Sequence, residues 1–163
     1  MKIAICPGTF DPVTIGHVDI ILRASNMFDK VIVAVLVNDS KSLTFSLEER
    51  LRFLNKTFND YDNIEVDYFN GLLADYAKNK NAAAIVRGLR AISDFEYEFQ
   101  MALINKKLNP ELETIFLMTQ SNNMYLSSSV VKQVAYLNGD IYDFVPKSIY
   151  LDIKNFFERN EQE

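Results

Sequence analysis

Short apolar runs recur along the chain and alternate with longer segments whose apolar residues have helical spacing. The runs cover residues 2–6, 31–37, 64–68, 83–86 and 114–118. Their length and mostly apolar character are typical of strands that are buried on both faces of a sheet. The pattern therefore predicts five short parallel strands.

The segments between these runs carry helix signals. Residues 46–49, Ser-Leu-Glu-Glu, have the spacing of a capping box, and residues 16–28 place four apolar side chains on one side of a helix: Val18, Ile21, Leu22 and Ala24. Strict alternation of strand and helix with short connections predicts a doubly wound sheet covered by helices on both faces. The predicted fold class is α/β and Rossmann-like, with a five-stranded parallel sheet in the order 3-2-1-4-5.

Nothing along the chain marks a second domain. The sequence has no internal repeat, no low-complexity tract and no linker rich in Gly, Pro or Ser, and 163 residues is the size of one ordinary domain. We therefore predict a single domain over residues 1–163, with a frayed polar tail at residues 158–163.

Charge and cysteine content limit which binding partners and which cellular compartment are expected for the protein. The net charge is -5, from 17 basic and 22 acidic side chains, which argues against a nucleic-acid surface and for local phosphate binding. Cys6 is the single cysteine and cannot form an internal disulfide, and the first residues do not resemble a signal peptide. No apolar stretch approaches the roughly 20 residues that span a bilayer. We therefore expect a cytoplasmic protein with neither a membrane nor a nucleic-acid partner.

One predicted helix, residues 95–108, is more apolar than a surface helix requires. It has two apolar stripes, Phe95, Phe99, Ala102 and Leu103 on one and Tyr97, Met101, Ile104 and Leu108 on the other. Such a helix can lie sandwiched inside one domain, or it can offer one stripe to a neighbouring subunit. The pattern leaves both interpretations open.

The first strand is followed by a segment suited to phosphate binding. It reads Pro7-Gly8-Thr9-Phe10-Asp11-Pro12, and Thr14-Ile15-Gly16-His17 then opens a helix. Gly8 permits a tight turn, and Gly16 permits a ligand to approach the helix start, where free N–H groups favour phosphate. Ligands of open α/β sheets bind at this edge of the sheet. The segment predicts a phosphate cradle, in which Thr9 either closes the turn or contacts the phosphates.

His17 is the only histidine of the chain. A lone histidine is often an ordinary surface or core residue. Here it stands in the first turn of a helix, directly after a glycine, in a strand-loop-helix unit. Its imidazole is therefore a candidate donor that stabilises charge on a phosphoryl group in the transition state.

Cationic and hydroxyl side chains follow the other strands. Arg87 and Arg90 flank Gly88-Leu89 after the fourth run, and Lys41 follows the second. The predicted strand order makes the first and fourth strands neighbours, so both arginines are expected opposite His17. Solvated charge is the alternative for each cation. Ser127-Ser128-Ser129 predict a helix N-cap, a second anion site, or both.

The sequence lacks the motifs of several other kinds of enzyme. The sequence has no Gly-x-x-x-x-Gly-Lys-[Ser/Thr] loop, no Cys/His metal spacing and no nucleophile elbow. No carboxylate cluster suggests a metal site made by the protein. Any Mg²⁺ is therefore expected to be held mainly by substrate phosphates and water.

Taken together, these motifs resemble a known enzyme family. Residues 8–12 and 14–17 resemble the signature of the nucleotidylyltransferase superfamily. Four further blocks stand in the order and at the spacing of bacterial phosphopantetheine adenylyltransferases: residues 87–91, 94–98, 110–113 and 127–129. The resemblance covers about residues 3–146. Thr14 stands where related nicotinamide mononucleotide adenylyltransferases and cytidylyltransferases usually carry His, which favours this family.

The resemblance implies a role for each site residue. His17 would be catalytic, and the phosphopantetheine site would consist of Thr9, Lys41, Leu73 and Arg87. The ATP site would consist of Thr9, Phe10, His17, Gly88, Leu89, Arg90, Glu98, Asn123, Met124, Tyr125, Leu126, Ser127, Ser128 and Ser129. Without the resemblance, Leu73 would be interpreted as a core leucine and Glu98 as part of a solvated helix face. Asn123 departs from the aromatic residue that the family often has there.

The implied reaction transfers AMP from ATP to 4′-phosphopantetheine, giving dephospho-coenzyme A and pyrophosphate in coenzyme A biosynthesis. A phosphate monoester with a second pKa of ~6 is mostly dianionic at pH 7, so direct in-line attack needs neither a general base nor a covalent intermediate. The resemblance also implies Mg²⁺ and a homohexamer. Two alternatives remain: another nucleotidylyltransferase, such as nicotinamide mononucleotide adenylyltransferase, and a non-catalytic nucleotide-binding regulatory module.

Overall fold

A five-stranded parallel sheet forms the centre of the protein. The computed structural model describes residues 1–37 and 42–160. The strand order is β3-β2-β1-β4-β5, so β1 lies between β2 and β4. The strands are β1 (Ile3–Gly8), β2 (Lys30–Leu36), β3 (Ile64–Phe69), β4 (Ala84–Leu89) and β5 (Glu113–Met118). The predicted fold class and strand order are confirmed.

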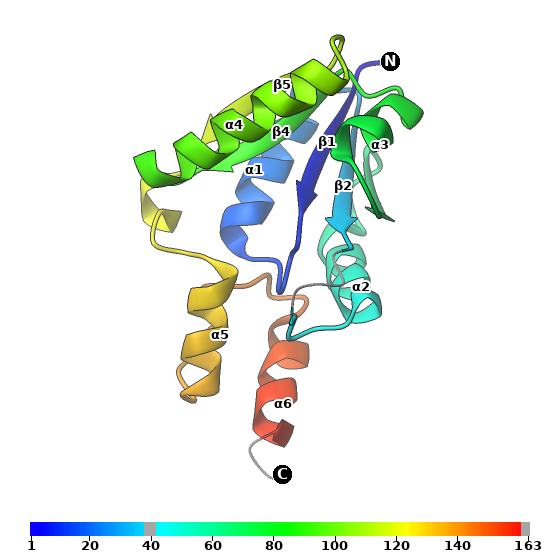
Figure 1. The fold of residues 1–163 in the computed structure, drawn as a ribbon. Coiled ribbons are helices and arrows are strands. Elements are labelled where there is room, and N and C mark those ends of the chain that lie inside the picture. Colours follow the sequence, from blue (N-terminus) through cyan, green and yellow to red (C-terminus); the bar gives the residue numbers. More distant parts are fainter. Residues whose placement is uncertain (38–41, 161–163) are drawn as a thin grey trace.

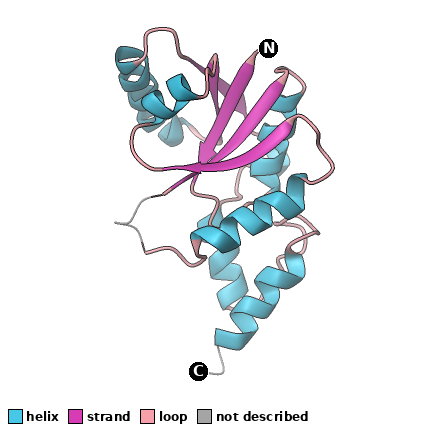
Figure 2. Cartoon of the chain, turned by 90° about the vertical axis from the view of Figure 1, so that its right-hand side faces the viewer, coloured by secondary structure: helices cyan, strands magenta, loops and turns pink. Residues whose placement is uncertain are grey.

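Helices cover both faces of the sheet. Helices α1 (Ile15–Ser25) and α2 (Leu47–Phe58) pack on one face, and α3 (Leu73–Asn79) and α4 (Ile92–Leu108) pack on the other (Figure 1). A short 3₁₀ helix, η1 (Ser121–Asn123), separates β5 from α5 (Ser128–Tyr136). Helices α5 and α6 (Tyr150–Asn160) lie beyond the carboxyl ends of the strands (Figures 1 and 2). This end of the sheet is where the predicted site residues gather.

The three central strands β1, β2 and β4 are mostly buried on both faces, as their apolar runs predict, whereas the edge strands β3 and β5 are mainly half-buried. In β1, Ala4 and Cys6 belong to the core cluster that also contains α1 and α2, whereas Ile5 belongs to the cluster under α3. The first cluster continues into α5 and α6 through Val131 and Ile153. One continuous core therefore holds the two helices beyond the strand ends against the rest of the domain.

Strands β1 and β4 reach further into the motifs than their apolar runs indicate. Parallel pairing continues to Gly8 opposite Val35 and to Leu89 opposite Met118. Arg87, Gly88 and Leu89 therefore lie within β4 and not after it, where the apolar run predicted them. The apolar run ends at the first charged residue, but a side chain that points into a cavity does not interrupt the hydrogen-bonding ladder.

Helix α4 leaves both of its apolar stripes accessible. Six of its large apolar side chains are exposed, from 43% for Phe95 to 63% for Tyr97, with Phe99, Leu103, Ile104 and Leu108 between these values, whereas Met101 is half-buried. A helix sandwiched inside the domain would bury both stripes, so that interpretation is wrong for the single chain.

Within residues 1–37 and 42–160, no helix is long and apolar enough to cross a membrane.

The C-terminal helix is longer than the sequence suggests. Helix α6 continues through Asn160, so residues 158–160, which we expected to fray, are helical. Its buried residue Ile153 anchors it to the core. Residues 161–163 lie outside the described part of the chain.

Candidate active site

A cavity of about 530 Å³ opens where the carboxyl ends of β1 and β4 meet the starts of α1 and α5. Its walls come from segments that are far apart in the sequence. The predicted site residues that line it are Thr9, Phe10, His17, Arg87, Gly88, Arg90, Glu98, Asn123, Leu126, Ser127 and Ser128. The cavity is therefore the location that the sequence analysis anticipated, at the point where the winding of the sheet reverses.

The imidazole of His17 is oriented by the start of its own helix. Thr14 is the N-cap of α1, and its backbone N–H donates to Nδ1 of His17 at 3.0 Å. Because Nδ1 accepts this hydrogen bond, the proton of the neutral ring resides on Nε2. Burial, followed by the charges of Arg87 and Arg90, lowers the pKa of His17 from its usual 6.5 to about 4. His17 is thus a neutral ring at pH 7 whose free N–H can donate to a ligand in the cavity.

We expect nitrogen NMR of the imidazole to detect this state directly. His17 is the only histidine, so its ring signals need no assignment by mutation. The ring should stay neutral, with the proton on Nε2, from about pH 8 to about pH 5, because both burial and neighbouring arginines disfavour the charged form. A titration midpoint near the ordinary histidine value of ~6.5 would contradict the arrangement.

The loop after β1 packs around one aromatic ring. Phe10 has a φ of 51° and is buried, and its ring meets the ring of His17 edge-on at a centroid distance of 5.3 Å. A side-chain Cβ on Gly8 would stand 2.8 Å from the Phe10 ring. Gly8 is therefore required for the close approach of this ring. The tight turn that we predicted at Gly8 is instead made at Phe10, which carries the left-handed backbone conformation.

Arg87 is held by Glu98 on the wall of the cavity. The guanidinium makes two hydrogen bonds to the Glu98 carboxylate, one of them from Nε at 2.8 Å, and a third to the backbone oxygen of Pro7. The Glu98 side chain is only 13% exposed, so the interpretation of Glu98 as a solvated helix face is wrong. The pair joins β4, α4 and the end of β1.

Arg90 forms a more exposed ion pair at the cavity. It contacts Asp94 at 3.1 Å and donates to the backbone oxygen of Leu126 at 3.2 Å. Leu126 directly precedes the three serines, so Arg90 lies toward the start of α5. The two arginines therefore line the same cavity but contact different segments, Arg87 the end of β1 and Arg90 the residue before the serines.

Two of the three serines have defined hydrogen-bond partners. Ser127 is the N-cap of α5 and accepts from the backbone N–H of Val130 at 3.1 Å. The hydroxyl of Ser128 donates to the backbone oxygen of Pro12 at 2.8 Å. Ser127 and Ser128 line the cavity, so the first turn of α5 faces the same space as that of α1. Capping by a serine is confirmed, and the anion site remains a prediction.

Five predicted residues do not line this cavity. Leu89 is buried, Met124 and Tyr125 are exposed, Ser129 follows the lining serines, and Leu73 packs against the core cluster under α3. Lys41 lies outside the described residues. Sequence reasoning in turn did not select Tyr97, Asp94 and Thr119, which do line the cavity. The helical spacing of Asp94, Tyr97 and Glu98 was the available signal, since residues three and four apart share one face.

The described residues contain no group of three or more His, Cys, Asp or Glu side chains that could hold a metal ion. At the cavity, Asp94 and Glu98 are each paired with an arginine. Their carboxylates thus already have cationic partners.

Comparison with known proteins identifies the class of this fold and site. The model of the cytidylyltransferase-like family matches residues 5–134. Together with the cavity between two helix starts, this match defines a nucleotidyltransferase of the cytidylyltransferase-like class.

Individual relatives narrow this class to one family. Over 98% of its length, the chain is 56% identical to the complete phosphopantetheine adenylyltransferase of Caldanaerobacter subterraneus subsp. tengcongensis. It is also 56% identical to that of Clostridium tetani, covering 94% of the chain and 96% of the relative. The chain belongs to the phosphopantetheine adenylyltransferase family, which confirms the resemblance found in the sequence.

Solved structures of more distant proteins share the fold. A bifunctional nicotinamide mononucleotide adenylyltransferase/ADP-ribose pyrophosphatase from Francisella tularensis superposes with a TM-score of 0.70 at 16% identity, over 99% of this chain and 54% of that one. The nicotinic acid mononucleotide adenylyltransferase of Plasmodium falciparum has a TM-score of 0.65 at 17% identity, over 98% and 96% of the two chains. At such identities the likeness concerns the fold alone.

Proposed function

We propose that this protein is a nucleotidyltransferase of coenzyme A biosynthesis that transfers AMP from ATP to 4′-phosphopantetheine, releasing dephospho-coenzyme A and pyrophosphate. The observation that carries this conclusion is the near full-length identity of 56% to phosphopantetheine adenylyltransferases. The cavity supports it, because one space is lined by two helix starts, two arginines and a neutral histidine. This inventory suits two anionic substrates that must be brought together.

The chemistry we propose is direct attack of the acceptor phosphate on the α-phosphorus of ATP. The acceptor is mostly dianionic at pH 7, since its second pKa is ~6, and therefore needs no general base. The bond to the α-phosphorus forms as the bond to the pyrophosphate oxygen breaks, and pyrophosphate leaves with the electron pair. The protein supplies position and charge stabilisation, with Nε2–H of His17 donating to an oxygen of the α-phosphoryl group in the transition state.

The positions of the arginines support a division of labour. Arg90 contacts the backbone beside the α5 serines, so we assign it to the ATP side together with Ser127 and Ser128. We assign Arg87 to the acceptor phosphate, with Thr9 between the two substrates. Arg87 shares its guanidinium with Glu98, so Glu98 would act on the substrates by orienting Arg87. The assignments of Leu73 and Lys41 to the acceptor site rest on the family resemblance alone.

We propose that Mg²⁺ enters with ATP and is held mainly by its phosphates and by water. The donor set of the cavity fits this role, because both of its acidic side chains already have arginine partners. Bound Mg²⁺ would supply neutralisation of phosphate charge. The single cysteine of the chain fits a cytoplasmic location for the reaction.

We propose further that the protein assembles as a homohexamer through α4. The support is the exposed apolar surface of this helix, which a lone chain would leave in water. Sedimentation velocity should reveal a hexamer for the wild type and smaller species for Leu103→Glu, because a buried unpaired charge opposes association. Asn55→Glu, on the exposed surface of α2 across the sheet, is the matched control and should remain hexameric.

A substrate panel tests the proposed function. Pyrophosphate release from ATP should depend on 4′-phosphopantetheine and should be absent with nicotinamide mononucleotide. Release only with nicotinamide mononucleotide would reject the acceptor while leaving the reaction class intact. ATP binding without pyrophosphate release from any acceptor would indicate the regulatory-module alternative.

A further inference from the structure

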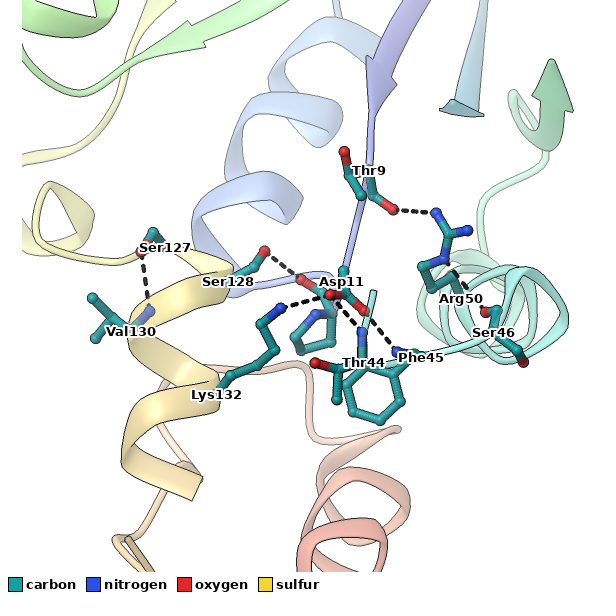
Figure 3. A network of polar contacts seen from close by, with 11 residues as sticks. Thr9, Asp11, Thr44, Phe45, Ser46, Arg50, Ser127, Ser128, Val130 and Lys132 are labelled. Atoms are coloured by element: carbon teal, nitrogen blue, oxygen red, sulfur yellow. Dashed lines mark hydrogen bonds and ion pairs between the residues drawn. The ribbon is translucent and has the colours of Figure 1, made fainter. Parts of the chain in front are cut away.

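A buried carboxylate outside the cavity connects two of the segments that build it, the loop after β1 and helix α5, with the segment that precedes α2. Asp11 is only 3% exposed and does not line the cavity. Its carboxylate accepts hydrogen bonds from the backbone N–H groups of Thr44 at 3.1 Å and Phe45 at 2.8 Å (Figure 3). Nζ of Lys132, on α5, completes its shell with an ion pair of 2.6 Å. Asp11 thus joins the loop after β1, the segment before α2 and helix α5.

A second buried charge holds the same loop from the side of α2. Arg50 is 3% exposed, and its Nη1 donates to the backbone oxygen of Thr9 at 2.9 Å. Its Nε donates to the backbone oxygen of Ser46, the N-cap of its own helix, at 3.4 Å. Thr9, one of the residues that line the cavity, is therefore held through its backbone oxygen by Arg50, which does not line the cavity.

Helix α5 is attached to this loop at two points. The hydroxyl of Ser128 donates to the oxygen of Pro12, and one turn further along the helix Lys132 pairs with Asp11 (Figure 3). Two contacts four residues apart on one helix face determine both the distance and the rotation of the helix relative to the loop. The first turn of α5 and residues Thr9 and Phe10 consequently face the same cavity in one defined arrangement.

A buried ion pair is an expensive way to hold two segments together, because both charges lose water. Apolar side chains of similar volume often provide equal or greater stability. Such pairs are better suited to selecting one geometry, and charge-assisted hydrogen bonds to two backbone N–H groups add directionality. The side chain of Asp11 is 4% exposed and that of Lys132 is 27% exposed, so solvent screens the pair only partly.

We infer that Asp11 and Lys132 are positioning residues for adenylyl transfer. Their ion pair sets the separation between the loop at residues 8–12 and the first turn of α5, so that donors from both engage the phosphates of one ATP. Neither side chain lines the cavity, so both would act through the segments that they hold. This inference rests on the proposed function only in that the chain transfers a nucleotidyl group, whichever phosphate accepts it.

The test compares three lysine variants. Lys132→Met removes the charge and keeps the length, Lys132→Arg keeps the charge, and Lys56→Met is the matched control. Lys56 forms an ion pair with Asp152 at 2.9 Å between α2 and α6, and neither partner lines the cavity. Steady-state kinetics are measured at a temperature at which circular dichroism finds each variant folded.

We expect Lys132→Met to lower kcat at least 10-fold while the KM for ATP changes less than about threefold, because small misplacement costs more in the transition state than in the ground state. Lys132→Arg should restore most of the rate, and Lys56→Met should keep the wild-type kcat and KM. A folded Lys132→Met variant with wild-type kcat would overturn the inference. Equal losses in Lys132→Arg and Lys132→Met would also overturn it, because charge would then be irrelevant.

A double-mutant cycle tests whether the two residues act as one unit. Asp11→Asn keeps the shape of the side chain, and the double variant with Lys132→Met should be no slower than the slower single variant. Fully additive losses would contradict a shared role. If the wild type uses a different acceptor, only the proposed substrate fails, and the lysine series is run with that acceptor. If no acceptor is used, both proposals fail.

Discussion

Replacing His17 with alanine is expected to lower kcat by 10²- to 10³-fold, the usual effect of removing a preorganised donor to transition-state charge. The reason lies in the orientation of the ring. The backbone N–H of Thr14 donates to Nδ1, and burial together with Arg87 and Arg90 keeps the ring neutral. The single ring proton therefore resides on Nε2, where it can be donated in a hydrogen bond to the substrate. The KM for ATP should change much less, because the contact strengthens only as charge develops. Pyrophosphate release under saturating substrates measures the effect.

The His17 side chain also completes the capping box of its helix, so a second variant must separate this role from catalysis. Alanine removes the acceptor of the Thr14 N–H, and loss of one such hydrogen bond typically costs about 0.5–1.5 kcal/mol of stability. Glutamine at this position can restore a capping box, since Glu and Gln are its usual third residues. His17→Gln should therefore recover thermal stability relative to alanine and remain slow. If His17→Ala retained the wild-type rate, the histidine would have no part in the mechanism.

The second large effect is expected from the two arginines, which should give separable defects. Arg90→Ala should raise the KM for ATP, and Arg87→Ala should raise the KM for 4′-phosphopantetheine. Each increase should be about 10- to 100-fold, corresponding to the roughly 1.5–3 kcal/mol of a hydrogen bond to a charged group. The division follows from position, because Arg90 contacts the oxygen of Leu126 beside the α5 serines, whereas Arg87 contacts Pro7 at the end of β1. Initial-rate kinetics with each substrate varied in turn will measure both constants.

The chain offers a close control for Arg90. Arg23 pairs with Asp19 at 3.2 Å and donates to the backbone oxygen of Met118 at 2.8 Å, and its side-chain exposure of 38% matches the 40% of Arg90. It does not line the cavity, so Arg23→Ala should leave both constants unchanged.

Arg87 needs a different control. Its removal leaves the nearly buried carboxylate of Glu98 without its partner, which destabilises the protein independently of substrate binding. The double variant Arg87→Ala/Glu98→Gln removes both charges. It should be more stable than Arg87→Ala and should keep the raised KM for the acceptor. Identical changes in both substrate constants for Arg87→Ala and Arg90→Ala would contradict the proposed division.

Features with short-range causes were predictable from the sequence. The capping box at Ser46 formed as expected, because its hydrogen bonds join residues three apart. Alternating apolar runs and helical segments were sufficient to predict a doubly wound parallel sheet, because right-handed crossovers leave few other arrangements, and the predicted strand order agrees with the observed one. The same reasoning placed Arg87 and Arg90 at one cavity with His17.

Features with long-range causes were not predictable in this way. Asp11 stands in a loop between Phe10 and Pro12, where a solvated carboxylate is the ordinary expectation. Its partners Thr44, Phe45 and Lys132 are 33, 34 and 121 residues away, so nothing in the local sequence signals its burial. Gly8 was assigned to a turn for a similar reason, because the ring that excludes its Cβ is placed by the packing of the whole loop.

By itself, then, the sequence determined the succession of strands and helices, the winding of the sheet and the chemical types of the candidate groups, because these depend on periodicity and on residues near one another in the chain. The tertiary structure alone decided which groups have partners. It joined Arg87 to Glu98, exposed both stripes of α4 and buried His17 beside two arginines, which lowers the pKa of its ring and keeps it neutral. Burial and the charges of distant segments set these properties, and both arise only when the strands have assembled into the sheet.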